Sequence, residues 1–292
     1  MSADLQLPTL LQMAPIGLDD MKAVRLMNRM DQKYIAPAVL LEPLLQRIAA
    51  DYYVQRIPSA PDTQNPESKI QSSELIAPYR TLYFDTADLA MYTMHHNQKL
   101  NRQKLRVRTY RSTDTTFFEI KNKDNKGKTR KVRIPIDVSL FDNALEVPEV
   151  QDFVNRNTPY STQAINHSSN QAILYPTLEN RFDRITLVDR GMSERVTIDH
   201  GIRFHNRATG NVVGSADNRM ICDADIAHAL VIEVKHEVGA PTSAIERALH
   251  DLHIQPRRMS KYCIGTALTN PNAKHNRFKS KLLYINKIQE NR

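Results

Sequence analysis

The sequence predicts an α+β fold: an eight-stranded antiparallel β-barrel with helices packed outside. Two observations support this prediction. Short segments throughout the chain alternate charged and apolar residues with a period of two, as strands with one polar and one apolar face do. Between them lie segments with apolar residues at helical spacing, which can cover the apolar face of the sheet.

The strand prediction rests on the alternation within each segment. The expected strands are 25–35, 80–85, 103–111, 117–123, 130–136, 182–189, 194–200 and 230–237. In the third of these, Lys104, Arg106 and Arg108 share one face, while Leu105 and Val107 share the other. About eight antiparallel strands suffice to close a barrel, and closure turns the charged face into a lumen.

The charged face calls for an explanation beyond exposure to solvent. On a single strand, a charged face opposite an apolar one is usually just solvated. Across the whole set, however, Lys, Arg and an occasional Glu recur where a solvated face would also mix Thr, Ser and Gln. Two like charges about 4 Å apart repel by about 4 kcal/mol at an effective dielectric near 20. The gathered cations therefore predict a bound polyanion or a metal-bound anion.

Four helices are expected around the strands. Residues 37–50 open with proline at a first-turn position and carry leucine and isoleucine at helical spacing. A second helix is expected over 86–96, with Asp85 helping to cap it. A capping box that starts at Ser243 predicts a third helix, and 260–268 is the fourth.

The domain organisation is simple. Residues 1–270 are expected to form a single domain, and the basic segment 271–292 a tail or a helix. Two polar stretches without periodicity, 58–78 and 155–170, are expected to be mobile insertions. No segment approaches about 18 uncharged apolar residues, and the N-terminus has no basic region followed by an apolar one. Neither a transmembrane helix nor a signal peptide is therefore expected.

Composition narrows the class of partner. With 41% apolar and 25% charged residues, the chain has the composition of an ordinary soluble globular protein. The net charge of +8 suggests nucleic acid, an anionic membrane or phosphate compounds as partners, although a merely basic surface explains it equally well. Cys222 and Cys263 lie in no CxxC or Cys/His spacing, and we interpret them as reduced thiols of a cytoplasmic protein.

An ordered series of short motifs resembles a known family. The series is NRMDQKY at 28–34, LYFDT at 82–86, RVRTY at 106–110, EIK at 119–121, KVR at 131–133, NRFDR at 180–184, ERVTID at 194–199, EVK at 233–235 and SKY at 260–262. It resembles the VTC domain, the polyphosphate polymerase domain of the vacuolar transporter chaperone complex. That family belongs to the triphosphate tunnel metalloenzymes, or CYTH-like superfamily, which implies an eight-stranded antiparallel tunnel and a divalent metal.

The resemblance implies roles for individual residues. The residues implied to hold phosphate oxygens in catalysis are Arg106, Arg108, Lys121, Lys131, Arg184, Arg195 and Lys235. Those implied to bind substrate are Lys33, Arg29, Arg133, Ser260 and Lys261. Arg suits bidentate contacts to phosphate, whereas Lys acts as a compact point charge.

The implied metal is Mn²⁺ or Mg²⁺, held by one or two carboxylates and completed by substrate phosphates. Glu233 is similar to the family's metal-ligating glutamate, and Glu119 is expected to assist it. Asp199 is a further carboxylate that could bind metal or act as a base, but an ion pair with a lumen arginine is the favoured interpretation.

The implied activity is a metal-dependent transfer of the γ-phosphate of ATP to a growing polyphosphate chain inside the cationic tunnel. No P-loop is present, since 124–130 contains a single Gly and no GKS or GKT, so side chains must grip the phosphates. The first alternative is an inorganic or nucleoside triphosphatase of the same fold, with water as the acceptor. The second is a non-catalytic polyanion-binding module.

The expected partners are ATP, pyrophosphate and polyphosphate. Nucleic acid is not expected, because the cationic face has few aromatic residues on which bases could stack. The sequence carries no regulatory domain ahead of the barrel and no membrane segment after it. We therefore expect a stand-alone catalytic domain of bacterial type, located in the cytoplasm and held at the inner face of a membrane only if a separate membrane protein recruits it.

Overall fold

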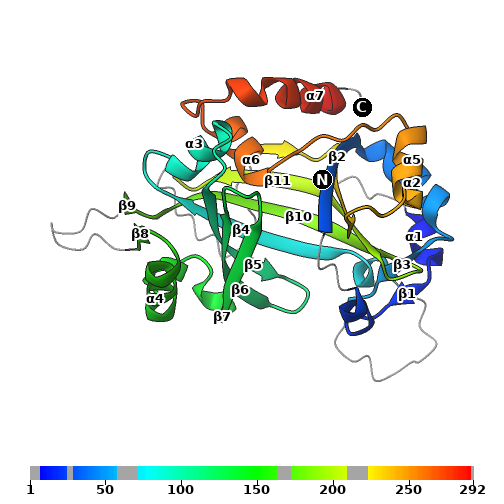
Figure 1. Cartoon of the computed structure of the whole chain (residues 1–292), viewed down its shortest axis with the longest axis horizontal. Coiled ribbons are helices and arrows are strands. Elements are labelled where there is room, and N and C mark those ends of the chain that lie inside the picture. The colour runs from blue at the N-terminus through cyan, green and yellow to red at the C-terminus, as the bar shows by residue number, and fades with distance from the viewer. Residues whose placement is uncertain (1–6, 25–28, 58–70, 163–171, 209–222, 291–292) are drawn as a thin grey trace.

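A large antiparallel sheet forms the centre of the protein (Figure 1). The computed structural model describes residues 7–24, 29–57, 71–162, 172–208 and 223–290. Eight strands follow one another in hydrogen-bonded order: β2 (Arg29–Pro37), β13 (Ala229–Glu237), β11 (Glu194–Asn206), β10 (Tyr175–Asp189), β4 (Ala77–Asp85), β5 (Arg102–Tyr110), β6 (Thr115–Lys123) and β7 (Thr129–Ile136). Every one of the eight expected strands is present, which confirms the predicted α+β class.

The strand path starts at β2 and ends at β7, and no ladder joins these two strands within the described residues. Shorter strands extend the sheet: β1 (Pro15–Ile16), β3 (Tyr52–Gln55) and β12 (Ala224–Ile226). A separate parallel pair consists of β8 (Tyr160–Ser161) and β9 (Ala172–Ile173).

The helices cover the apolar face of the sheet and one end of its charged face. They are α1 (Pro8–Gln12), α2 (Leu41–Ile48), α3 (Ala90–His96), α4 (Pro148–Asn157), α5 (Ala244–Asp251), α6 (Lys261–Thr269) and α7 (Lys279–Glu290). Figure 1 shows α1, α2 and α5 gathered at one end of the molecule, with α4 at the other. None of the described helices is long and apolar enough to cross a membrane.

The helix starts follow the predicted capping chemistry. Ser243 and Glu246 form the expected capping box of α5. The Asp85 carboxylate accepts hydrogen bonds of 2.8 Å from the backbone N–H groups of Met91 and Tyr92 in α3. Asp85 thereby satisfies donors that the first turn of a helix leaves unpaired.

Regular structure extends into both expected insertions. Residues 71–78 contain a short 3-10 helix (Ser72–Glu74) and the first residues of β4, while 58–70 lie outside the described residues. In the second stretch, α4 continues to Asn157 and β8 follows, while 163–171 are not described. The segment after residue 270 forms α7, whose Ile285 and Ile288 are buried in the core.

The pairing register assigns the charged residues of the predicted alternation to a single face. Directly opposed residues of an antiparallel pair point to the same side of the sheet. Lys33 opposes Glu233, and Arg184 opposes Asp199. On the other half of the path, Arg106, Glu119 and Arg133 form one cross-strand row, and Lys104, Lys121 and Lys131 form the next. The alternation seen in the sequence therefore produces one continuous charged surface, which we call the cationic face.

Most of the opposite face is apolar and buried. Leucine and isoleucine side chains of α2 and α5 pack on the strand residues Val196, Ile232 and Val234. At the other end, α4 packs on Leu105 and Phe118. Burial of each such side chain contributes roughly 1.5–3 kcal/mol, which fixes the sheet and directs its charged side chains the other way.

α6 lies on the cationic side, over the apolar end of that face. Its Gly265 sits so close to β10 and β11 that a Cβ atom there would lie 2.6 Å from Leu178 and closer still to the Phe204 ring. The absence of a side chain at position 265 thus lets the helix approach the sheet, and its N-terminus, Ser260 and Lys261, reaches the cationic residues.

Candidate anion-binding site

Three carboxylates on the cationic face each hold two cations. Glu233 on β13 lies 3.3 Å from the Lys33 ammonium and 3.4 Å from that of Lys235. Burial alone would raise the pKa of Glu233, but Lys33, Lys235 and Arg184 lower it well below its usual range. The carboxylate is therefore charged, and its side chain remains 17% exposed toward the face.

Asp199 forms the second group. Its two oxygens accept hydrogen bonds of 2.5 and 2.8 Å from the Arg184 guanidinium, and Lys261 of α6 also contacts it. Burial opposes the charged form of Asp199, but the two cations outweigh burial and lower its pKa. This arrangement confirms the expected ion pair of Asp199 with an arginine of the charged face.

Glu119 forms the third group. The Arg106 guanidinium contacts one of its oxygens at 2.5 and 2.7 Å, and Lys131 contacts the other. Burial raises the pKa of Glu119, but Arg106, Arg108 and Lys131 together lower it to about 2. The Glu119 side chain is fully buried, so it neutralises the charges of Arg106 and Lys131 from beneath them.

Other cations have no carboxylate within ion-pair distance among the described residues. Arg108 is buried, and its Nε donates to the Thr81 hydroxyl over 3.2 Å. Burial and the neighbouring Arg106 and Arg184 lower the pKa of Arg108. Lys121 lies in the same surroundings, and repulsion from Arg106, followed by burial, lowers its pKa strongly. An anion bound beside Arg108 and Lys121 would relieve this repulsion.

Lys104 is a third cation of this kind, and it connects the sheet to α6. Its ammonium donates a 2.8 Å hydrogen bond to Ser260, the N-cap residue of α6. Burial lowers the pKa of Lys104 to about 8, and that of Lys261 likewise. Ser260 and Lys261 thus stand between β5 on one side and β11 on the other, beside the unneutralised cations.

The remaining predicted residues lie toward the edges of the face. Arg195 opposes Lys235 in the sheet, and its guanidinium donates to the Met21 carbonyl over 3.2 Å. Arg133, on the terminal strand β7, lies 4.1 Å from the centre of the Phe117 ring. Arg29 is the first residue of β2, but its side chain lies outside the described residues, as does Arg25.

Two polar residues of the face were not predicted to bind substrate. Asn180 on β10 is fully buried, and both atoms of its amide lack a hydrogen-bond partner among the described residues. It shares the cross-strand row of Thr81 and Arg108. The hydroxyl of Thr197 is unpartnered in the same sense and lies opposite Glu233. Buried polar groups without partners cost free energy, so both are available to a ligand.

The arrangement of the carboxylates also limits the kind of metal site that the cationic face can form. No group of three or more His, Cys, Asp or Glu side chains converges in the described parts of the chain. A metal cage made only of protein ligands therefore does not fit. A single carboxylate completed by phosphate oxygens does fit Mg²⁺ or Mn²⁺, and Glu233 is the most exposed of the three carboxylates that hold cations here.

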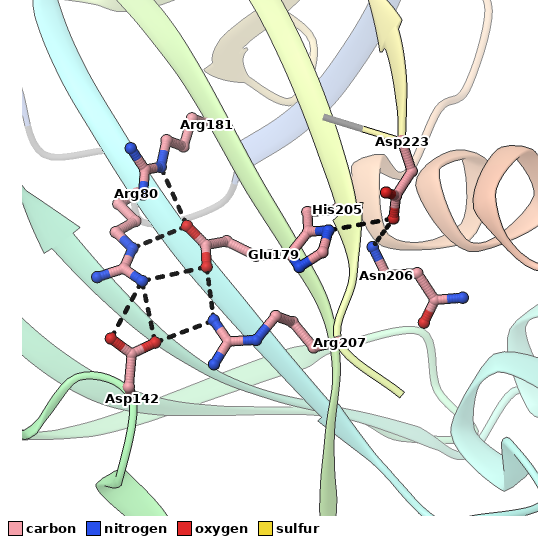
Figure 2. A network of polar contacts seen from close by, with 8 residues as sticks. All are labelled: Arg80, Asp142, Glu179, Arg181, His205, Asn206, Arg207 and Asp223. Carbon is pink, nitrogen blue, oxygen red and sulfur yellow. Dashed lines mark hydrogen bonds and ion pairs between the residues drawn. The ribbon is translucent and has the colours of Figure 1, made fainter. Parts of the chain in front are cut away.

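A second charged network lies on the opposite face and is self-sufficient (Figure 2). Glu179, which is buried, accepts from Arg80 at 2.8 Å, from Arg207 at 2.7 Å and from Arg181 at 3.0 Å. Arg80 and Arg207 also contact Asp142, each at 2.9 Å. Because these guanidinium groups already face carboxylates, we assign the network to structure and not to anion binding.

Comparison with known proteins identifies a family to which the chain is similar. The family model of the VTC domain matches residues 28–270. A search of curated proteins finds no match to the sequence.

Three solved structures among those matched are described as candidate adenylate cyclases. The one from Hippeastrum, described as having a dominant triphosphatase activity, has a TM-score of 0.42 and 12% identity, and covers 82% of this chain and 96% of that chain. The protein from Vibrio parahaemolyticus gives 0.41 and 9%, covering 82% and 99%. The protein from Bacillus halodurans gives 0.41 and 13%, covering 80% and 94%.

Proposed function

Because the chain belongs to the VTC domain family, we propose that it is a polyphosphate polymerase, which transfers the γ-phosphate of ATP to the end of a growing polyphosphate chain. One observation carries the proposal. Arg108, Lys121 and Lys104 stand together on the cationic face without carboxylate partners among the described residues, while the cations around them are paired. Such a charge surplus is unfavourable, and a bound anion would offset it.

The spacing of the cations fits a chain of phosphates better than a single phosphate. Side chains on one face of a strand repeat about every 6.6 Å, from a rise of about 3.3 Å per residue. Arg106 and Arg108 repeat in this way on β5, and Lys104 precedes them on the same face. A column of this length supports the binding of successive phosphates along the strand.

The proposed reaction is an in-line displacement. A terminal oxygen of the polyphosphate chain attacks the γ-phosphorus of ATP and forms the new P–O bond. The bond between that phosphorus and the β–γ bridging oxygen breaks, and its electron pair leaves with ADP. Arg106, Arg108, Lys121 and Arg184 would neutralise the charge on the transferred group and hold the reacting oxygens in line.

The outer residues complete the proposed roles. Lys131, Arg195 and Lys235 would contact other phosphates of the donor or the chain, as would Lys33 and Arg133 nearer the edges. A divalent cation, when bound through Glu233 and phosphate oxygens, would add Lewis-acid charge neutralisation. Glu119 would act on the same reaction chiefly by fixing Arg106 and Lys131, with which it pairs.

The deciding experiment measures the fate of the transferred phosphate. The full chain is incubated with ATP and Mn²⁺ or Mg²⁺, with and without pyrophosphate as a primer, and the products are resolved by gel and by phosphorus NMR. We expect ADP release to be matched by an acid-labile polymer that an exopolyphosphatase degrades. Free orthophosphate equal to ADP, with no polymer even after primer is added, would identify a triphosphatase instead. Absence of ADP would identify a binding module.

A further inference from the structure

An aromatic pair lies in the middle of the cationic face. Tyr79 on β4 and Phe182 on β10 are directly opposed across the two strands. Their rings are stacked, with centroids 5.1 Å apart and planes 12° from parallel. Tyr79 is 8% exposed and Phe182 only 2%, so the pair is part of the wall beneath the cations and offers no open platform for a base.

Three cations surround this pair. The Phe182 ring centre lies 4.3 Å from the Lys261 ammonium, 5.3 Å from the Arg184 guanidinium and 5.8 Å from that of Arg108. The Tyr79 ring lies 4.8 Å from Arg184 and 5.3 Å from Arg108. The π face of an aromatic ring attracts cations but carries no net charge. The rings can therefore hold these cations in place without neutralising them. Arg184 and Lys261 are also paired with Asp199, whereas Arg108 has no carboxylate partner among the described residues and keeps its charge available to an anion.

The Tyr79 hydroxyl is free to donate a hydrogen bond. Within the described residues it has no hydrogen-bond partner, and the charged groups that act on it are Arg184, Arg108 and Asp199. Burial raises the pKa of this phenol, so it keeps its proton at neutral pH. A protonated hydroxyl among cations that would bind phosphate is well suited to donate to a phosphate oxygen.

We propose that Tyr79 and Phe182 form an uncharged part of the phosphate site. The Tyr79 hydroxyl donates a hydrogen bond to a phosphate oxygen, and Phe182 is a positioning residue that gathers Arg108, Arg184 and Lys261 around one ring. This inference rests on the proposed phosphate-chain site, but it does not depend on which acceptor takes the phosphoryl group. It adds two residues without charge to the cations of the site.

The test is the binding of tripolyphosphate to the full chain, measured by calorimetry at several salt concentrations without nucleotide or metal. Tyr79→Phe keeps the ring and removes only the donor. We expect it to weaken binding by roughly tenfold, as for the loss of a hydrogen bond to a charged group. The slope of log Kd against log salt should stay at its wild-type value, because no charge is lost. Tyr53→Phe is the matched control, since the Tyr53 ring stacks on Arg190, a residue outside the proposed phosphate site.

Phe182 is tested by a pair of substitutions. Phe182→Leu removes the ring and should weaken tripolyphosphate binding by about three- to tenfold, whereas Phe182→Tyr keeps a ring and should restore most of the affinity. The melting temperature of each ligand-free variant separates this effect from loss of packing. If Phe182→Leu lowers the affinity and Phe182→Tyr does not restore it, Phe182 serves packing alone and its positioning role is rejected.

The outcomes also distinguish this inference from the proposed function. If the Tyr79→Phe affinity equals that of the wild type, the hydroxyl does not touch phosphate and that part of the inference is wrong. If wild type binds tripolyphosphate but releases only orthophosphate from ATP, the polymerase proposal fails while the binding comparison still decides the roles of Tyr79 and Phe182. If wild type does not bind tripolyphosphate at all, both proposals fall together.

Discussion

Lys104 on β5 donates its 2.8 Å hydrogen bond to Ser260, the residue that caps α6. The partner is neutral, so the hydrogen bond orients the ammonium without offsetting its charge. It also ties the start of α6 to a strand that lies across the face from Asp199, which contacts the next residue, Lys261. Ser260 and Lys261 are thereby held from two sides at the point where the cations are densest.

The first prediction concerns proton uptake on binding. Burial lowers the pKa of Lys104 and Lys261 from 10.5 to about 8, so the folded, ligand-free protein binds fewer protons than the unfolded chain between about pH 8 and 10.5. Their contribution to the free energy of unfolding therefore rises with pH across that window. A bound phosphate chain favours the ammonium forms and raises both pKa values.

Tripolyphosphate binding at about pH 8.5 should consequently take up protons and weaken as the pH rises further. The measurement is calorimetry in two buffers of different ionisation enthalpy. Lys104→Met should reduce the number of protons taken up. An apparent enthalpy that is identical in both buffers would show that neither lysine changes its protonation state.

The second prediction separates two carboxylates. Glu233→Gln should lower phosphate transfer by about two orders of magnitude or more and weaken Mn²⁺ binding in the presence of tripolyphosphate, while the fold persists. Glu119→Gln should instead lower the melting temperature, because it leaves Arg106 and Lys131 without their buried counter-charge. Activity and Mn²⁺ titrations are compared for the two variants. Wild-type metal dependence in Glu233→Gln would remove this residue as the ligand.

The third prediction is that one substitution in the site stabilises the ligand-free protein. Lys121 is repelled by Arg106 and Arg108, so Lys121→Met should raise the melting temperature without ligand by about 2–4 °C, which corresponds to about 1 kcal/mol. The further rise on adding tripolyphosphate should shrink, because a phosphate contact is lost. Lys126→Met, in an exposed turn, is the control and should change neither value. A destabilised Lys121→Met protein would contradict the charge surplus.

The fourth prediction tests the structural network of Figure 2. Glu179→Gln leaves Arg80, Arg181 and Arg207 short of a buried counter-charge and should cost roughly 3–5 kcal/mol in the free energy of unfolding. Asp142→Asn, at an exposed carboxylate, should cost about 1 kcal/mol or less. Urea denaturation measures both variants. The affinity of the folded fraction for tripolyphosphate should match wild type in each case.

The pH dependence of the same network has a definite sign. Arg80 and Arg181 lower the pKa of Glu179 to about 2, although burial acts against them. Stability from Glu179 is therefore fully present above its usual pKa near 4.5 and is lost as the pH falls toward about 2. Glu179→Gln should lack this part of the acid denaturation profile.

The sequence predicted every strand of the main path but not the full length of several, above all β10 and β11. β11 was expected to end at residue 200 and continues to Asn206. A bulge explains the difference: Gly201 has a φ of +59°, and the register with β10 shifts there. The bulge changes which alternate residues face the cations, so Asp199 and Phe204 share a face although one number is odd and the other even.

The underestimated strand length also explains why Asn180 was not predicted to belong to the site. β10 was expected to begin at residue 182, but it starts at Tyr175 and pairs with the part of β11 that follows the bulge. Period-two alternation identifies a strand but cannot show which segment will be its neighbour. The carboxylate–cation groups were beyond sequence reasoning for a related reason, since Lys261 meets Asp199 only when α6 lies across the sheet.

The site is sensitive to substitution at Gly265, a residue without a side chain. A methyl group at this position would collide with Phe204 and Leu178, and the whole of α6 would have to move away from the sheet. Lys261 and Ser260 lie about one helical turn away, so they would move with it. A substitution of Gly265 would then impair substrate binding although it alters no charged or polar group. The residue of α6 without a side chain is thus one at which a small change reaches the cationic face.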